Sequence, residues 1–492
     1  MGSMKKLAAL LLWWGGFLGV LSAATPIAGE AAGIANPADA DLGVSRFFTN
    51  PNPTPSAPLG SKEWLGGNSL TGDWSGFRNR LDERGVEFSA SYTSNFAGNP
   101  VGGITQAFAY AENYTFGLLL DFGKMQVAPG LKMMISGLDR NGSNLSARHI
   151  GNQFTVQQVY GTQTVVFYAF YLEQSFLDDQ LSLKVGRFST GDEFAASPIY
   201  WLHMSNGIDG NPQSLPVNTA FSTYPGSVWA ARVRVDPDPE WFGLAGIYQA
   251  TKLNLYQEHG LDWSLGSSDG ILLIAQAGWT PEFFKKPVAS APPPDGKSAV
   301  AAQSLARGKT SRSPSDAPEM LGLPGHYWVG AYYSSWKYPQ FNSGQTTTNS
   351  YGFYAHADQM ISQETPGSEQ GLTLWAAAVL SPQQNIAKLP FQINAGLFYT
   401  GLLPSRDNDI AILGFACGNF SKDFAQSVTA NPSTPNSNLP APTSEIAIEL
   451  GYRYQFTQFA CFQPNLQWII RPGGSAGIPN ALVIGAQINV TF

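Results

Sequence analysis

The side chains best suited to chemistry gather between Ser189 and Gly226, a stretch without a single lysine or arginine. It combines carboxylates, amides and rings: Asp192, Glu193, Tyr200, Trp201, His203, Asn206, Asp209 and Asn211. Glycosidases use two carboxylates that are separated by a defined gap across the sugar. Asp192 and Glu193 are adjacent, and adjacent side chains of an extended chain point to opposite faces. The stretch therefore predicts hydrogen bonding and ring stacking with a polar ligand, not catalysis.

No other pattern predicts an enzyme or a cofactor site. The five histidines, at 149, 203, 259, 326 and 356, lack the HxxxH-type spacing of zinc sites. A phosphate-binding loop of the GxxxxGK[ST] type is absent from the sequence. Cys417 and Cys461 are the only two cysteines, so no disulfide framework is expected. We expect no catalytic residue, no metal and no cofactor.

The elements that must position these residues are strands in which every second residue is apolar. In residues 445–456, Ile446, Ile448 and Leu450 share one face, and Glu445 and Glu449 share the other. Charged residues are 13%, aromatics are 13% and the mean hydropathy is -0.11. This combination is typical of a transmembrane barrel, whose lipid-facing residues are every second one. The net charge of -7 gives no reason to expect a nucleic-acid partner.

The alternation predicts an all-β fold, a 16-stranded antiparallel transmembrane β-barrel. The strands are expected at 86–96, 112–121, 130–138, 163–176, 180–188, 227–235, 241–249, 270–280, 326–335, 350–362, 371–380, 389–399, 409–418, 444–456, 460–471 and 481–492. Short and long connections alternate, so short turns are expected at the periplasmic end and long loops outside. An even number of strands returns the chain to the periplasmic side. There the last strand must pair with the first, because an open sheet edge cannot lie in lipid.

Four segments outside the strands of the barrel domain (86–492) have sequence patterns of their own. Residues 1–24 combine two lysines, an apolar run and small residues, as in a secretory signal peptide, with 1–3 as a cloning remnant. Residues 25–65 are a Pro/Ala-rich periplasmic leader. Residues 66–85 predict a short periplasmic helix capped by Thr71 or Asp73 and ended by Gly85. The insert 281–325 is predicted to be a disordered periplasmic loop.

A series of motifs then points to a family. They are TGDWSGFRNRLDERGVEFSASY, LKVGRFSTGDEFAASPIYW, NGIDGNPQSLP, YPGSVWAARVRVDPDPEWFGLAGIYQ, GLPGHYWVGAYY, GLLPSRDNDIAILGFACGNFS and FQPNLQWIIRPGG. In this order they resemble the carbohydrate-selective porins of the OprB family, from Gly66 to Phe492. The resemblance departs at 281–325 and has no motif before Gly66. It implies a 16-stranded outer-membrane porin with a short N-terminal periplasmic helix, which passes sugars, glucose among them, by facilitated diffusion.

Under this resemblance the loop 189–226 is expected to fold into the barrel and form a constriction. Its substrate-binding residues are predicted to be Asp192, Glu193, Tyr200, Trp201, Asn206, Asp209 and Asn211. The inward wall is predicted to supply Lys132, Lys184, Arg232, Arg234 and Arg453. Acids facing cations across the pore would orient a neutral dipolar sugar. In the alternative interpretation, these side chains only fold the loop and keep the lumen wet.

The expected partners are sugars, outer-membrane lipid and lipopolysaccharide. The resemblance also implies that the assembly machinery of outer-membrane barrels reads Phe492, in the outer membrane of a Gram-negative bacterium. The oligomeric state, monomer or trimer, stays open. Two other functions also stay open: a general or anion-preferring diffusion porin, and a secreted all-β protein that binds or hydrolyses carbohydrate.

Overall fold

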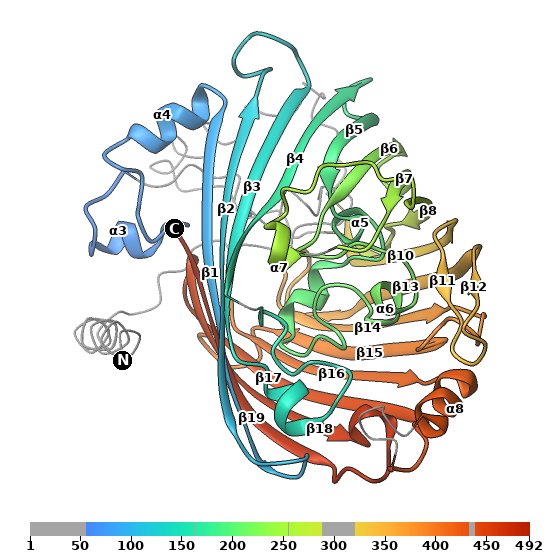
Figure 1. Cartoon of the computed structure of the whole chain (residues 1–492). Coiled ribbons are helices and arrows are strands. Elements are labelled where there is room, and N and C mark those ends of the chain that lie inside the picture. The colour runs from blue at the N-terminus through green and yellow to red at the C-terminus, as the bar shows by residue number, and fades with distance from the viewer. Residues whose placement is uncertain (1–55, 162, 254, 288–319, 432–437) are drawn as a thin grey trace, which may run out of the picture.

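The computed structural model describes residues 56–161, 163–253, 255–287, 320–431 and 438–492 (Figure 1). The predicted signal peptide, most of the leader and residues 288–319 of the insert lie outside the described residues. The largest element is a single antiparallel sheet of 17 strands, in which strands pair in chain order, except that β8 pairs with β10 past β9 and β10 pairs with β13. β1 pairs with both β2 and β19, so the sheet closes on itself. Without β9 (Glu282–Pro287), the remaining 16 strands form the barrel wall.

The wall strands agree with the predicted segments to within a few residues. They are β1 (Val86–Val101), β2 (Phe108–Asp121), β3 (Leu131–Gly142), β4 (Thr164–Phe176), β5 (Leu181–Phe188), β6 (Val228–Asp238), β7 (Trp241–Ala250), β8 (Gly270–Trp279), β10 (Met320–Ser334), β13 (Ser350–Gln363), β14 (Gly371–Leu380), β15 (Phe391–Thr400), β16 (Ile410–Asn419), β17 (Ser444–Thr457), β18 (Ala460–Ile470) and β19 (Ala481–Thr491). A small hairpin of β11 (Tyr338–Pro339) and β12 (Thr346–Thr347) lies in the connection before β13. The predicted fold class is confirmed.

The two faces of the wall differ as the alternation predicts. Leu450 of β17 and Ile484 of β19 are 54% and 55% exposed on the outer face, whereas Glu449, next to Leu450 in the chain, is fully buried inside. Glu112 of β2 is an exception. Its neighbours Asn113 and Thr115 line the lumen, so Glu112 faces outward, where its Oε2 accepts hydrogen bonds from the Tyr92 and Tyr110 hydroxyls at 3.1 and 2.5 Å. Two phenols thus compensate a carboxylate on the lipid-facing side.

The barrel has two distinct ends. At the short-turn end, connections such as 177–180, 239–240 and 458–459 are brief, and both β1 and β19 reach this end. At the long-loop end lie the connections 143–163, 189–227, 251–269 and 420–443. Their helical segments are η1 (Ser146–Ile150), α5 (Thr190–Glu193), η2 (Pro198–Leu202), α6 (Ser214–Asn218), α7 (Leu255–Glu258) and α8 (Lys422–Ala430), with η3 (Pro472–Gly474) after β18. None of the helices in the described residues is long and apolar enough to cross a membrane.

The N-terminal helices lie beside the end of β19 (Figure 1). They are α3 (Lys62–Leu65), which occupies the last residues of the predicted leader, and α4 (Phe77–Glu83). The predicted caps Thr71 and Asp73 are wrong, because α4 begins after Gly76. Gly85 does follow the helix, with a φ of +83°. Leu70 donates its amide to the Thr491 carbonyl at 2.9 Å, which ties this segment to the last strand.

The ends of the insert 281–325 are ordered, in contrast to the prediction. β9 pairs antiparallel with the beginning of β10, with Phe283 opposite Leu323. This pairing extends the strand hydrogen bonding of the wall beyond the short-turn end. Trp279 packs on Phe283 and on Tyr327, with ring centroids 5.6 and 5.7 Å apart. Paired backbone and packed rings explain why these ends are strands despite the composition of the insert.

Both cysteines are free, as predicted. Cys417 pairs with Ile446 of β17, and Cys461 pairs with Gln455 of the same strand. Their partners are nine positions apart along β17, which at about 3.4 Å per residue separates the two levels by roughly 30 Å. A disulfide requires Cα atoms within about 7 Å.

Candidate functional site

The connection between β5 and β6 folds into the barrel, and Figure 1 shows α5 and α6 enclosed by the wall strands. Local sequence explains its turns. The Ser189 hydroxyl accepts the Gly191 amide at the start of α5, and the Ser197 hydroxyl accepts the Ile199 amide at the start of η2. Pro198 occupies the first turn of η2, where a missing N–H costs nothing. Two serine caps therefore divide the loop into short helical turns that fit within the lumen.

The wall satisfies the backbone of this inserted loop. Glu449 of β17 accepts the amides of Met204 and Ser205 at 2.7 and 3.0 Å. Glu445 accepts the amides of Gln153 and Phe154, both at 2.7 Å, from the connection that carries η1. Buried amides need such partners, because water does not reach them. These inward carboxylates therefore anchor the loops. The sequence had instead suggested that inward polar residues face a water-filled lumen.

Wall amides complete the same network. Gln463 of β18 donates to the Leu202 carbonyl at 2.7 Å, and Gln467 donates to the Val156 carbonyl at 3.0 Å. Gln392 of β15 accepts the Ser214 amide at 2.7 Å. Each of these glutamines is buried at an inward position of its strand. The loop is therefore held from several sides of the barrel.

The predicted acids and cations meet directly. Glu193 lies 2.6 Å from the Lys184 ammonium and 2.7 Å from Nε of Arg232. Glu173 of β4 completes the cluster, 2.7 Å from Arg232 and 3.4 Å from Lys184. The side chains of Lys184, Arg232 and Glu193 are at most 4% exposed. Acids facing cations across an open gap are therefore not what the structure shows here, because the charges neutralise one another in a buried contact.

Four further predicted loop residues take part in the packing of the loop, with Asp192, Tyr200 and Asn211 buried and Asn206 half-buried. Asp192 accepts the Tyr168 hydroxyl, and the Asn211 side chain donates to the carbonyls of Gly191, Phe194 and Ala195 at 3.0 to 3.2 Å. The Tyr200 hydroxyl lies 2.8 Å from Nδ1 of His356, and burial raises the pKa of Tyr200 well above its usual value. The Asn206 amide donates to the Thr155 carbonyl at 2.7 Å. These contacts lie within the loop and between the loop and the wall, and a sugar-binding role for these four residues stays a prediction.

Two predicted cations lie elsewhere. Arg234 of β6 pairs with Asp236 at 2.7 Å near the short-turn end. Lys132 is exposed at the beginning of β3, which is also at that end. Neither is among the described residues that line the central cavity. A side chain that faces inward therefore need not lie at the depth of the loop.

Below the loop lies a cavity of about 950 Å³ that extends to the short-turn end, hereafter the chamber. Three of the predicted residues line it: Trp201, Asp209 and Arg453. Arg453 of β17 donates to the Trp201 carbonyl at 3.2 Å and to Oε1 of Gln463 at 3.1 Å. The structure thus brings together a ring, a carboxylate and a guanidinium at the loop, with a wall of strands around them.

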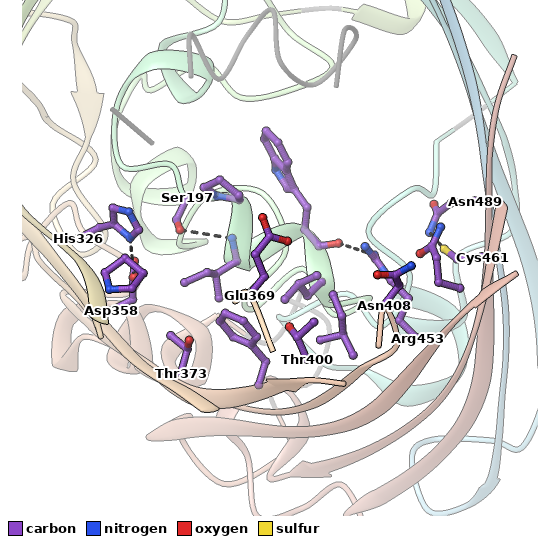
Figure 2. A pocket seen from close by; sticks show the side chains of 18 of the residues that line it. Ser197, His326, Asp358, Glu369, Thr373, Thr400, Asn408, Arg453, Cys461 and Asn489 are labelled. Carbon is purple, nitrogen blue, oxygen red and sulfur yellow. Dashed lines mark hydrogen bonds and ion pairs between the residues drawn. The ribbon is translucent and has the colours of Figure 1, made fainter. Parts of the chain in front are cut away.

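Polar residues on the opposite side of the chamber were not predicted from the sequence. Figure 2 shows His326 (β10) and Asp358 (β13) across from Arg453, with Thr373 (β14) and Thr400 (β15) between them. His326 and Asp358 are joined by a contact of 2.7 Å. The only indication in the sequence was their inward position in predicted strands. Many residues share that property, and it does not show which of them lie at the same depth in the barrel.

Comparison with known proteins agrees with this arrangement. The family model described as "Carbohydrate-selective porin, OprB family" matches residues 105–492, which include the loop and most of the chamber wall. The chain belongs to this family. As a member of the OprB family it is a channel, not an enzyme, and the inserted loop and the chamber lie on the path through its barrel.

Individual relatives of this OprB-family porin span nearly all of its barrel. Porin B of Pseudomonas aeruginosa is 26% identical over 451 residues, 86% of this chain and 91% of the relative. The putative porin QuiX of Acinetobacter baylyi is 22% identical over 86% of this chain and 93% of its own. The high-pH structure of Pseudomonas putida OprB has a TM-score of 0.74 at 25% identity and covers 86% of this chain and 98% of that chain.

Proposed function

We propose that this porin carries out facilitated diffusion of small neutral carbohydrates, monosaccharides such as glucose, across the outer membrane of a Gram-negative bacterium. The observation that carries the proposal is the chamber beneath the inserted loop, which Trp201, Asp209 and Arg453 all line. The indole offers a flat face for a pyranose, and the charged groups exchange hydrogen bonds with its hydroxyls. Weak contacts of this kind select a solute and still release it.

The loop is the constriction in this proposal. Its backbone is anchored to wall residues such as Glu449 and Gln463, so its shape does not depend on the solute. Solutes pass beside it and enter the chamber, which opens toward the short-turn, periplasmic end. The described charges that line the chamber are Asp209, Glu240, Glu282, Asp358 and Glu369 against Lys285 and Arg453. This excess of carboxylates disfavours the alternative of an anion-preferring pore.

Liposome swelling tests the proposal. Purified porin is reconstituted, and swelling rates are compared for glucose, a charged sugar acid and amino acids of matched size. We expect glucose to enter faster than both controls. Equal rates for all solutes of one size would leave a general diffusion pore as the function.

The terminal segment carries a separate part of the proposal. Phe492 still pairs with β1, since its amide donates to the Ala90 carbonyl at 2.8 Å. We propose that the barrel assembly machinery reads Phe492 before this pairing forms. Phe492→Ala should slow insertion in cells and leave folding into detergent unchanged; unchanged insertion in cells would contradict the role.

A further inference from the structure

A chain of hydrogen bonds runs from the inserted loop to the surface of the chamber. The Tyr200 hydroxyl lies 2.8 Å from Nδ1 of His356, and Nε2 of His356 lies 2.8 Å from Oδ2 of Asp358. Nδ1 of His326 lies 2.7 Å from Oδ1 of the same carboxylate. Side-chain exposure is 0% at His356, 4% at Asp358 and 18% at His326. Exposure therefore rises along the chain toward the chamber, which Asp358 and His326 both line and His326 reaches most openly.

The carboxylate in the middle decides the tautomers. An ionised carboxylate only accepts hydrogen bonds, so each neutral histidine must turn an N–H toward Asp358. His356 then carries its proton on Nε2, and its Nδ1 accepts the Tyr200 hydroxyl. His326 carries its proton on Nδ1, which leaves Nε2 as an acceptor. Within the described part of the chain, no hydrogen bond to Nε2 of His326 is formed.

Other side chains of the same chamber wall lie on the strands that follow. Thr373 of β14 and Thr400 of β15 both face the chamber (Figure 2). Thr373 is opposite Met360 of β13, two residues from Asp358, whereas Thr400 lies one strand farther from His326. Phe398 is the partner of Thr373 on β15 and adds an aromatic ring to the lining. An acceptor, a hydroxyl and a ring match the hydroxyls and the apolar C–H face of a sugar ring.

We propose that His326 and Thr373, with the ring of Phe398 beside Thr373, form a second sugar subsite, on the chamber side of the loop, for the hydroxyls of a neutral pyranose. This rests on the proposed function of the porin and adds a station below Trp201. Asp358 is a positioning residue, because it fixes the acceptor on His326 without touching the sugar. A carboxylate-bearing solute is disfavoured here, because Asp358 lies directly behind His326. Two successive weak stations allow a sugar to be passed on and released.

The test measures the block of ion current through single reconstituted channels by glucose added on the short-turn side. His326→Ala is expected to raise the half-blocking glucose concentration about two- to tenfold, as loss of one hydrogen bond predicts. His326→Gln keeps an acceptor and should stay within about twofold of the original protein. Thr373→Val preserves shape and should raise the half-blocking concentration by roughly twofold. His149→Ala, which alters a half-buried histidine outside the chamber, is the matched control and should change nothing.

A double-mutant comparison separates positioning from folding. Asp358→Asn should weaken glucose block when His326 is present, because an amide no longer dictates the tautomer. In the His326→Gln background the same change should have little further effect, because glutamine has no tautomer to fix. A purely structural role of Asp358 would give the same loss in both backgrounds and would remove the positioning role.

The outcomes distinguish the subsite from the proposed function. If glucose blocks the original protein and every folded variant at the same concentration, the subsite is wrong and the sugar pore stands. Thr373→Val provides this test even if His326→Ala fails to fold. If glucose neither enters liposomes nor blocks the original protein, the proposed function fails and the subsite fails with it.

Discussion

Glu193 of the inserted loop and Lys184 of β5 form a buried ion pair, with 2.6 Å between the carboxylate and the ammonium. Arg232 closes on the same carboxylate from β6 at 2.7 Å. Three charges from two neighbouring strands and a loop thus converge where water is excluded. The cluster ties the inserted loop to the wall. Its main effect is to fix the position of the loop, because buried ion pairs gain little net stability over apolar packing.

Breaking this pair should destabilise the folded barrel. Lys184→Met leaves Glu193 with a single cationic partner in a buried site, and we expect a loss of about 3–5 kcal/mol. The temperature at which the folded band disappears on an unboiled gel measures it. Lys124→Met is the control, since Lys124 pairs with Asp82 while 41% exposed and such pairs contribute about 0–1 kcal/mol. Equal loss in both variants would contradict the burial of the cluster.

The outer face should reject charge. Leu450 is 54% exposed to the surroundings of the barrel, and an arginine at the bilayer midplane costs about 2–4 kcal/mol. Leu450→Arg should therefore fold poorly into lipid vesicles, as protection from protease reports. Leu450→Met, at the same position, should fold normally. If the arginine variant folded as well as the methionine variant, the lipid-facing register of β17 would be wrong.

Glu449 should control the loop more than the wall. Its carboxylate accepts the Met204 and Ser205 amides and the Asn465 side chain, the last at 2.6 Å. Glu449→Ala leaves these donors without the acceptor, at a cost of about 1–3 kcal/mol for each unsatisfied group. We expect the barrel to form and single-channel conductance to rise as the loop loosens. Unchanged conductance in a folded variant would show that Glu449 does not hold the constriction.

Trp201 should govern sugar preference in the proposed mechanism. Trp201→Ala removes a ring from the chamber lining and should leave conductance equal or higher while glucose block falls. Asp209→Ala should weaken block by at most about 1.5–3 kcal/mol, the value of a hydrogen bond to a charged group. Trp263→Ala, which alters an indole packed on Phe170 outside the chamber, is the control. Unaltered block in both chamber variants would place the constriction elsewhere.

The cysteines offer a test of topology. Cys417 and Cys461 are free and lie at opposite levels of the wall. Two thiols should react with a chromogenic reagent in the denatured, unreduced protein. A bridged pair would be incompatible with the register of β16 and β18.

The wall of this porin was readable from the sequence because a pleat has a period of two. That period predicted the strands, the outward face of Leu450 and the inward face of Glu449, all of which the barrel confirms. The register of the strands also places the two cysteines at opposite ends of the wall. Local composition gave the wrong prediction at the ends of the insert. There Phe283 and Leu323 lie opposite each other in paired strands.

Only the tertiary structure decided which inward residues meet. Alternation assigns a side chain to a face, but not to a level or to a neighbour around the circumference. Glu449 and Met204 are separated by 245 positions, yet the loop amide finds its acceptor there. In the same way closure placed Glu193 against Lys184 and Arg232, and it put His326 opposite Arg453. The physical reason is that a buried loop backbone must pair its amides, and the barrel wall supplies the partners from strands remote in the sequence.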